Sequence, residues 1–133
     1  MRICAYIYCM IEHTDKIKAL GDETRLRIIR ILLKAGVQLC VCEIVRITGK
    51  PQYAVSRALG VLRTSHLVKE ERDGKLVKYE IIADNDFTRK LLDSVAAIKC
   101  AEIPAFSEDV KGIKLVLKSR GADGKPTEWC GCK

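Results

Sequence analysis

A break between two short helical segments, at Gly49 and Pro51, constrains the fold of this chain most. The segment from about Cys40 to Thr48 has a helical pattern that ends at Gly49, because glycine readily adopts the left-handed conformation that follows many helices. Pro51 suits the first turn of a second helix, which extends to about Ser65. We therefore predict two short helices joined by a tight turn.

A longer helical pattern precedes this pair, from Thr14 to Ala35. It is interrupted once, at Gly21, and Asp22 is placed to cap the helix that follows. Apolar residues recur in this segment at three- and four-residue intervals, as expected for helices with one buried face: Ile17, Leu20, Leu26, Ile29, Leu32 and Leu33.

Two extended segments follow the helices, Leu67 to Arg72 and Lys75 to Ile82, and Asp73-Gly74 joins them. Apolar and polar residues alternate in the second segment, and Asp-Gly between such segments is a strong hairpin signal. This order of elements predicts a winged helix-turn-helix, a mainly α fold with a small β-hairpin wing.

Gly60 lies inside the second short helix. Glycine in a helix costs roughly 1 kcal/mol relative to alanine. We therefore expect a close packing contact at Gly60.

The remainder of the chain predicts one more helix and an extension. The helix begins at Asp84 or Asp86 and ends at Pro104. We expect residues 1–10 to be an N-terminal extension, 11–104 the winged helix-turn-helix domain, and 105–133 a C-terminal extension. The C-terminal extension has a strand-like piece from Ile113 to Leu117, and it ends in a Cys-x-Cys motif. We expect a homodimer built on the first and last helices of the domain, with contributions from Leu91, Val95 and Ile98.

The second short helix has the composition of a DNA-reading helix. Short polar and basic side chains on its outward N-terminal face suit base edges in a major groove: Gln52, Tyr53, Ser56 and Arg57. Residues 50–78 contain seven basic residues against three acidic ones, and the chain has a net charge of +7, which favours a polyanionic partner. We expect double-stranded DNA as the partner, with further basic contacts from Lys50, Arg63, Arg72 and Lys75.

Cys40 and Cys42 lie at the start of the first short helix, beside the DNA-reading helix. Thiolates select soft metal ions and metalloids. Side chains at i and i+2 of a helix point to nearly opposite sides, so we expect that both can hold one ion only if the first turn unwinds or tilts. The pair is therefore a candidate switch, and the alternative is two small core residues.

The cysteine content indicates a reducing compartment. The chain has seven cysteines, an odd number, and no convincing signal peptide; Met10 is a second possible start. No apolar stretch approaches the roughly 20 residues that span a bilayer. We expect a cytoplasmic protein without a membrane partner, in which clustered cysteines bind metals or react.

Several segments resemble the ArsR/SmtB family of metal-sensing repressors. They are Lys18–Ile28, Leu39–Ile44, Gln52–Leu59 and the Asp73-Gly74 wing, and the resemblance covers about residues 11–98. It implies a dimeric winged-helix protein that leaves its operator when the inducing ion binds. Ala58 stands where the family pattern has a histidine, so one expected polar contact is missing.

The resemblance is to the arsenical branch, and it implies As(III) or Sb(III) as the inducer, bound by three sulfurs. Val45 occupies the position that supplies the third thiol in that branch. We expect Cys130 and Cys132 to complete the site with Cys40 and Cys42. Two other sources stay open: Cys4 with Cys9, and Cys100.

Other inducers and one enzyme class are alternatives. Cd(II), Pb(II) or Zn(II) could bind four thiolates, or an oxidant could close a disulfide. Cys40 to Arg46 also matches Cys-x5-Arg, the nucleophile loop of small phosphatases and thiol-based arsenate reductases. That loop favours Gly and Ser, because its amides must face an oxyanion. Glu43 would repel the anion, so we predict that the chain is not an enzyme.

Overall fold

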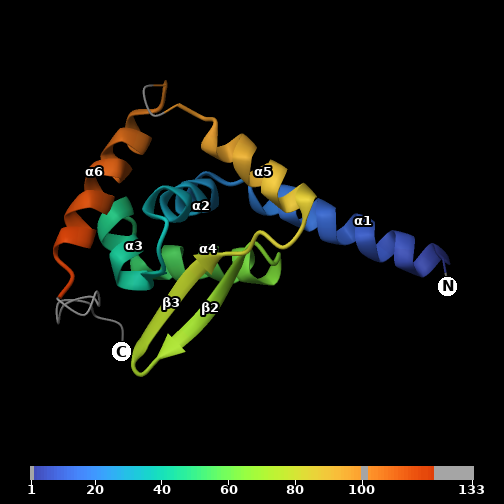
Figure 1. Cartoon of the computed structure of the whole chain (residues 1–133), viewed down its shortest axis with the longest axis horizontal. Coiled ribbons are helices and arrows are strands. Elements are labelled where there is room, and N and C mark those ends of the chain that lie inside the picture. Colours follow the sequence, from blue (N-terminus) through green and yellow to red (C-terminus); the bar gives the residue numbers. More distant parts are fainter. Residues whose placement is uncertain (1, 100–101, 122–133) are drawn as a thin grey trace.

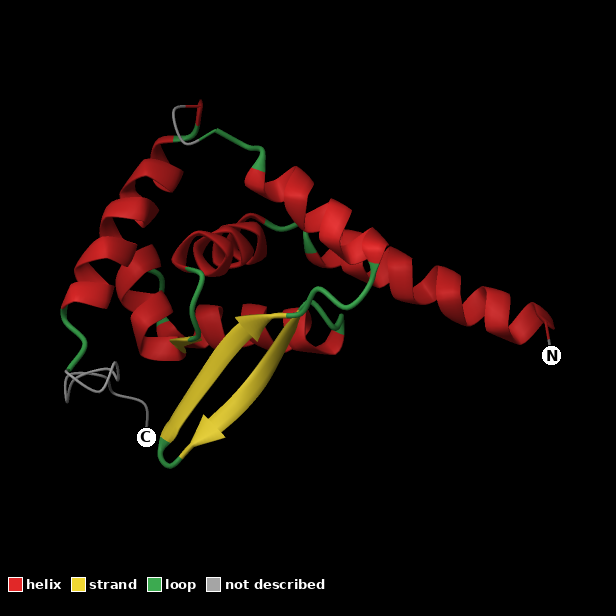
Figure 2. Ribbon diagram, viewed as in Figure 1, coloured by secondary structure: helices red, strands yellow, loops and turns green. Residues whose placement is uncertain are grey.

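The computed structural model describes residues 2–99 and 102–121 of the 133-residue chain. This part of the chain contains six helices and three short strands (Figures 1 and 2). In chain order they are α1 (Arg2–Ala19), α2 (Glu23–Ala35), β1 (Leu39–Cys40), α3 (Val41–Thr48), α4 (Gln52–Thr64), β2 (Val68–Asp73), β3 (Leu76–Ile81), α5 (Asp86–Ala96) and α6 (Pro104–Lys118). The helix-turn-helix is α3–α4 and the wing is β2–β3, which confirms the predicted fold class.

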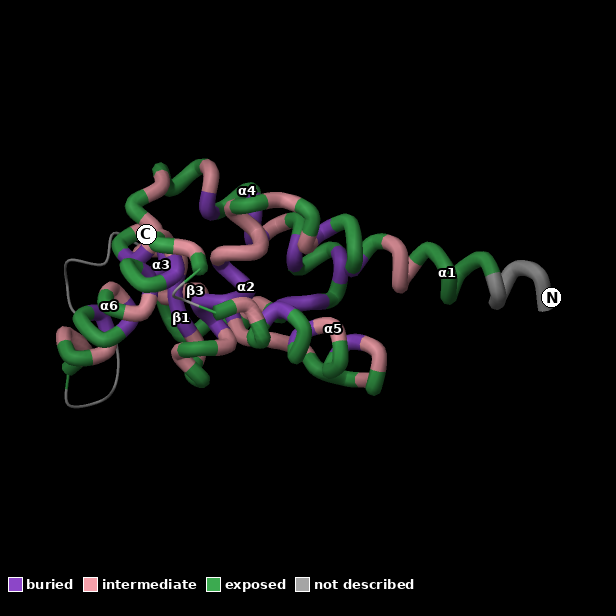
Figure 3. The backbone as a smooth tube through the Cα atoms, turned by 90° about the horizontal axis from the view of Figure 1, so that it is seen from above, coloured by how far each residue is buried: buried purple, intermediate pink, exposed green. Residues whose placement is uncertain are grey.

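α2 is the central helix of the core and contacts α3, α4, α5 and α6. Asp22 accepts a hydrogen bond from the Arg25 backbone N–H, as predicted for the helix cap, and Gly36 ends the helix with φ of 66°. The buried residues of α2 belong to one apolar core with those of α3 and α4; Figure 3 colours the backbone by how far each residue is buried. Each described helix is too short or too polar to cross a bilayer.

The three strands form one antiparallel sheet in the order β1-β3-β2. β2 and β3 pair from Val68 opposite Ile81 to Asp73 opposite Leu76. This confirms the predicted hairpin, with its turn at Gly74 and Lys75, one residue later than expected. β1 was not predicted, because its two residues are too few to show an alternation; they pair with Tyr79 and Lys78 of β3.

The chain after residue 96 differs most from the sequence-based expectation. α5 ends at Ala96, and Pro104 lies in the first turn of a new helix, α6, where proline is favoured. The predicted strand at 113–117 is wrong. Ile113 and Val116 are buried three residues apart, which is helical spacing, and a run of five residues is too short to distinguish the two periods. The expected division after residue 104 therefore falls in the first turn of a packed helix.

α1 is a long arm that extends away from the body (Figure 1). It runs without interruption from Arg2 to Ala19, so the expected division after residue 10 falls inside this helix. Its C-terminal half is attached to the body by Lys16, whose buried ammonium donates a hydrogen bond of 2.8 Å to the Thr88 hydroxyl. Residues 7–11, further toward the N-terminus of the arm, are exposed.

The prediction of a close contact at Gly60 is wrong. A Cβ at this position would have no atom within 4 Å. The close approach is at Gly112 of α6, where a Cβ would lie 3.3 Å from the Ile47 Cα of α3.

These two glycines allow a matched stability test. Gly60→Ala should raise the free energy of unfolding by roughly 0.5–1 kcal/mol, because alanine favours the helix and has free space. Gly112→Ala has the same helical advantage but crowds Ile47, so it should stabilise less or destabilise. Urea unfolding of both variants measures the difference, and a destabilised Gly60→Ala would contradict the open environment of Gly60.

Candidate functional site

The outward face of α4 consists of the side chains predicted to read DNA. Gln52, Tyr53, Ser56 and Arg57 are exposed, and Tyr53 retains 72% of its accessible surface. Val55, Ala58, Leu59 and Leu62 of the same helix are buried. Ala58 therefore faces the core, so the position where the family pattern has a histidine is not on the outward face of this chain.

Salt bridges within the wing reduce the number of available positive charges. Glu70 bonds Arg63 at 2.5 Å and lies 3.6 Å from Arg72. Two further pairs, Lys69–Glu80 and Lys78–Asp73, neutralise four more charges of the strands. The count of seven basic against three acidic residues omitted Glu80, which pairs across the sheet.

Three of the predicted DNA-binding cations have no ion-pair partner among the described residues: Lys50, Arg57 and Lys75. Arg63 and Arg72 already pair with Glu70, so a DNA phosphate would have to compete with this carboxylate for them. Glu70 also accepts a hydrogen bond of 3.3 Å from the Tyr79 hydroxyl. Burial, together with the Glu70 charge, raises the pKa of Tyr79, so this phenol is neutral at physiological pH.

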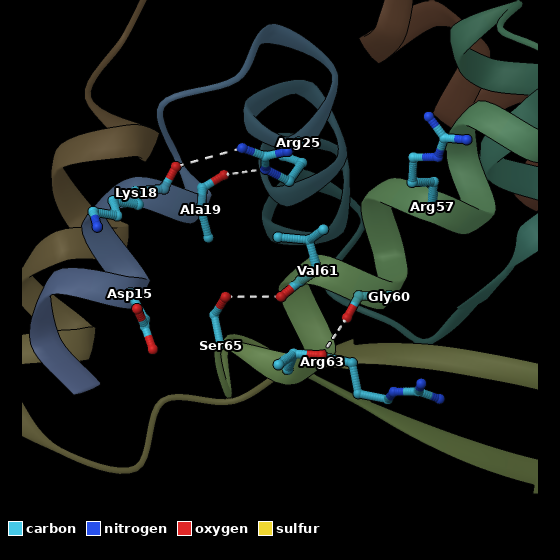
Figure 4. A pocket seen from close by; sticks show the side chains of 10 residues that line it. Asp15, Lys18, Ala19, Arg25, Arg57, Gly60, Val61, Arg63 and Ser65 are labelled. Carbon is cyan, nitrogen blue, oxygen red and sulfur yellow. Dashed lines mark hydrogen bonds between the residues drawn. The ribbon is translucent and has the colours of Figure 1, made fainter. Parts of the chain in front are cut away.

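A hollow of about 570 Å³ lies beside α4, between the ends of α1 and α2 that face it (Figure 4). Its lining includes the basic residues Lys18, Arg25, Arg57 and Arg63 and the acidic residue Asp15. The Arg25 guanidinium is already engaged, since its Nε donates to the Ala19 carbonyl at 2.7 Å. Sequence reasoning missed Lys18 and Arg25, because no local pattern brings the end of α1 to α4.

The two cysteines of the predicted switch lie side by side. Cys40 is the last residue of β1 and the N-cap of α3, with an extended backbone (φ −89°, ψ 165°), and it is buried. Cys42 is half-buried in the first turn of α3. Their Sγ atoms are 2.7 Å apart.

This geometry contradicts the expectation that α3 must unwind to bring the two thiols together. The i, i+2 rule applies to two helical residues, whereas the Cys40 backbone belongs to a strand. The extended backbone turns the Cys40 side chain back over the start of α3. Both sulfurs can therefore lie on the same side of the chain while Val41–Thr48 remains helical.

Sequence reasoning missed two residues at this site, Glu43 and Arg120. Glu43 is fully buried, and its Oε1 accepts a hydrogen bond of 3.1 Å from the Cys40 backbone N–H. Arg120 donates from Nε to Glu43 Oε2 at 2.9 Å and from Nη2 to Glu43 Oε1 at 2.8 Å. Cys-x-x-Glu has the spacing of a capping box, with Cys in place of Ser or Thr, so Glu43 had a signal in the sequence. Arg120 had none.

The other predicted ligands lie elsewhere. Cys100, Cys130 and Cys132 are outside the described residues. Cys4 and Cys9 belong to the N-terminal half of α1, at the opposite end of the molecule from α3 (Figure 1). Within residues 2–99 and 102–121, no group of three His, Cys, Asp or Glu side chains could hold a metal ion. This part of the chain therefore contributes a site of two sulfurs.

Comparison with known proteins identifies the family. A family model described as "Bacterial regulatory protein, arsR family" matches residues 22–70, from the N-cap of α2 into β2. An uncharacterised HTH-type transcriptional regulator of Methanocaldococcus jannaschii is 39% identical over 67 residues, which are 50% of this chain and 74% of that protein. The chain belongs to the ArsR family of transcriptional regulators.

Relatives within the ArsR family are named for different ions. A putative arsenical resistance operon repressor of Halobacterium salinarum is 41% identical over 70 residues, 53% of this chain and 54% of that protein. The chain thus spans about half the length of that relative. A cadmium resistance regulator CadC homolog of Staphylococcus aureus is 33% identical over 76 residues, 57% of this chain and 60% of that protein.

Two solved structures share the fold of this chain. The transcriptional repressor BigR of Xylella fastidiosa has a TM-score of 0.58 at 25% identity, and the match covers 77% of this chain and 97% of BigR. Reduced HlyU of Vibrio cholerae has a TM-score of 0.60 at 23% identity and supports the fold alone, over 72% of this chain and 97% of HlyU. The relatives are named as regulators, which confirms the prediction that the chain is not an enzyme.

Proposed function

We propose that this ArsR family member is a metalloid-responsive transcriptional repressor. It binds operator DNA in its ion-free form and dissociates when arsenite or antimonite binds cysteine thiolates. The observation that carries the proposal is the contact between the Cys40 and Cys42 sulfurs at the start of α3, the helix that packs on the DNA-reading helix α4.

The DNA-binding part rests on the exposed face of α4 and on the unpaired cations around it. Arg57 and Gln52 are placed to read bases, and Lys50 and Lys75 to contact phosphates on either side. Members of helix-turn-helix families read DNA with the helix that corresponds to α4. The hollow beside α4 adds Lys18 to the positive surface.

The ion-binding part rests on the donor set. In their reduced form, two cysteine sulfurs with no metal-binding histidine beside them among the described residues favour soft ions such as As(III), Sb(III) and Cd(II). Metal–sulfur bonds of about 2.3 Å at tetrahedral angles would hold two sulfurs roughly 3.8 Å apart. The Cys40 and Cys42 sulfurs, now at 2.7 Å, would have to separate by about 1 Å. We propose that this separation displaces the start of α3 and, through packing, α4.

A third sulfur is proposed from the C-terminal segment. Arg120 fixes the last part of the described chain beside α3, through Glu43 and through a bond of 2.7 Å to the Gln38 carbonyl. Cys130 follows ten residues later, and ten residues span up to about 33 Å. Cys130 or Cys132 can therefore reach the pair, whereas Cys9 of the same protomer belongs to the N-terminal half of α1, the arm that extends away from the body (Figure 1).

Three kinds of inducer are distinguished by one experiment: metalloids, divalent metal ions and an oxidant. Arsenite and antimonite need three sulfurs, whereas Cd(II), Pb(II) or Zn(II) could use Cys40, Cys42, Cys130 and Cys132 together. The short contact between the Cys40 and Cys42 sulfurs also favours oxidation as a signal. A gel-shift titration of the full chain with arsenite, antimonite, Cd²⁺, Zn²⁺ and hydrogen peroxide distinguishes these inducers.

The second copy of the chain is proposed to pack on α1. Ile7, Met10, Ile11 and Ile17 recur at helical spacing on this arm, and each is at least 50% exposed. The expectation that Val95 contributes to the dimer was wrong, because Val95 is 6% exposed and belongs to the protomer core. A two-fold dimer would present two α4 helices to a two-fold operator.

Two substitutions should separate base reading from phosphate binding. Arg57→Ala should weaken specific operator binding by roughly 1–3 kcal/mol, because it removes a base-edge contact. Lys75→Ala should weaken binding to any duplex and lower the salt dependence of the affinity. Fluorescence anisotropy with operator and scrambled duplexes measures both; normal operator binding by Arg57→Ala would mean that α4 is not the reading helix.

Single thiol substitutions should uncouple the inducer from the operator. Cys40→Ser and Cys42→Ser should bind operator as tightly as the parent chain, since neither thiol belongs to the DNA-reading face. Arsenite should no longer release either variant from the operator. In the parent chain arsenite should lower operator affinity by roughly 5- to 150-fold, the range typical of coupled sites. The matched control is Cys9→Ser. Full arsenite release by Cys42→Ser would remove the α3 pair from the proposed site.

A charge on the exposed arm should prevent dimerisation. Ile11→Glu places a carboxylate in the proposed apolar interface, whereas Lys18→Glu, at the end of the same helix, serves as the control. Sedimentation at micromolar concentration should show a monomer for Ile11→Glu and a dimer for Lys18→Glu. A monomeric parent chain would rule out this interface.

A further inference from the structure

α6 lies outside the segment that the ArsR family model matches, and two buried ion pairs attach it and the residues just after it to α2 and α3. The first joins Asp109 to Arg27 of α2 at 3.1 and 2.6 Å. The second joins Arg120, just after α6, to Glu43 of α3. Between them, Gly112 lies against Ile47, where α6 packs on α3.

The two ion pairs have the same chemistry but different neighbours. Asp109 raises the pKa of the Arg27 guanidinium through its hydrogen bond, although burial acts in the opposite direction. Arg27 of this pair also donates a hydrogen bond to the Thr48 carbonyl at the end of α3. Neither Arg27 nor Asp109 is bonded to Cys40 or Cys42. The Glu43–Arg120 pair adjoins Cys40, because Glu43 Oε1 accepts both from the Cys40 N–H and from Arg120 Nη2.

Glu43 Oε1 is bonded to both Arg120 and the Cys40 backbone, so the position of Arg120 affects the geometry of the two cysteines. Two bonds from Arg120 fix the orientation of the Glu43 carboxylate, and the carboxylate fixes the Cys40 backbone. The extended Cys40 backbone is what brings its sulfur to that of Cys42. Arg120 also offsets the Glu43 charge, which would otherwise lie unpaired beside two thiolates and repel the second of them.

We propose that Glu43 and Arg120 are positioning residues of the inducer site, so that α6 sets the affinity of the Cys40–Cys42 pair for soft thiophilic ions. The inference rests on the proposed function. Residues that orient metal ligands without touching the metal commonly change affinity by 10- to 100-fold, and Glu43 has this relation to Cys40. The ion-binding site is then a composite of the segment that the family model matches and a helix outside that segment.

Direct binding of arsenite to the full chain tests this inference. Near-UV absorption of thiolate-bound arsenic reports the affinity without DNA. Arg120→Gln and Glu43→Gln should each weaken arsenite binding by roughly 10-fold or more. Arg120→Lys keeps the charge but loses the two-pronged geometry, so it should recover part of the affinity.

The Arg27–Asp109 pair supplies the matched control. Asp109→Asn weakens the attachment of α6 but touches neither cysteine, so arsenite affinity should stay within about 2-fold of the parent, below the range for ligand-positioning residues. Equal losses in Asp109→Asn and Arg120→Gln would overturn the inference, since α6 would then act only through stability. Unchanged affinity in Arg120→Gln would overturn it as well.

The design separates this inference from the function on which it rests. If the parent chain binds no arsenite, the proposed inducer fails, and the same variants are compared with Cd²⁺ as the probe. If Glu43→Gln does not fold, Arg120→Lys and Arg120→Gln decide, because Arg120 is 16% exposed and lies at the end of a helix. Apo operator affinity, which should be unchanged in all folded variants, confirms an intact DNA-binding unit.

Discussion

The hydrogen bond from the Cys40 backbone N–H to the buried Glu43 carboxylate fixes the point at which β1 becomes α3. Cys40 pairs with Lys78 on one side of this point, so the strand joins the wing. On the other side α3 begins and supports the DNA-reading helix. A thiol at this junction is in contact with both parts of the DNA-binding unit. An ion that moves Cys40 relative to Cys42 therefore acts on the wing and on α4 together.

The segment that the ArsR family model matches, residues 22–70, includes α2, α3 and α4. α6 lies outside this segment and packs on α3. Arg120, just after α6, neutralises Glu43. A buried carboxylate without this partner would destabilise the start of α3. In this chain Glu43 connects the cysteine pair to the end of α6 through Arg120. The outward face of α4 takes no part in these contacts.

Local patterns predicted most of the fold. Asp22, Gly49 and Pro51 mark helix ends through backbone geometry alone, and the alternation around Gly74 marks the wing, so these elements could be predicted. The two residues of β1 and the five-residue run in α6 were too short to reveal their period. The thiol geometry was mispredicted because Cys40 was assigned to the helix, whereas cross-strand pairing holds its backbone extended. Arg120 could not be predicted, since its partner lies 77 residues away.

The central claim is that one ion at the start of α3 and the operator at α4 oppose each other. Thermodynamic linkage requires the effect to be reciprocal. Calorimetry of arsenite binding to the full chain, alone and saturated with operator duplex, measures it most directly. We predict that operator DNA weakens arsenite binding by the same factor, about 5- to 150-fold, by which arsenite weakens operator binding. Equal arsenite affinities with and without operator would contradict the account.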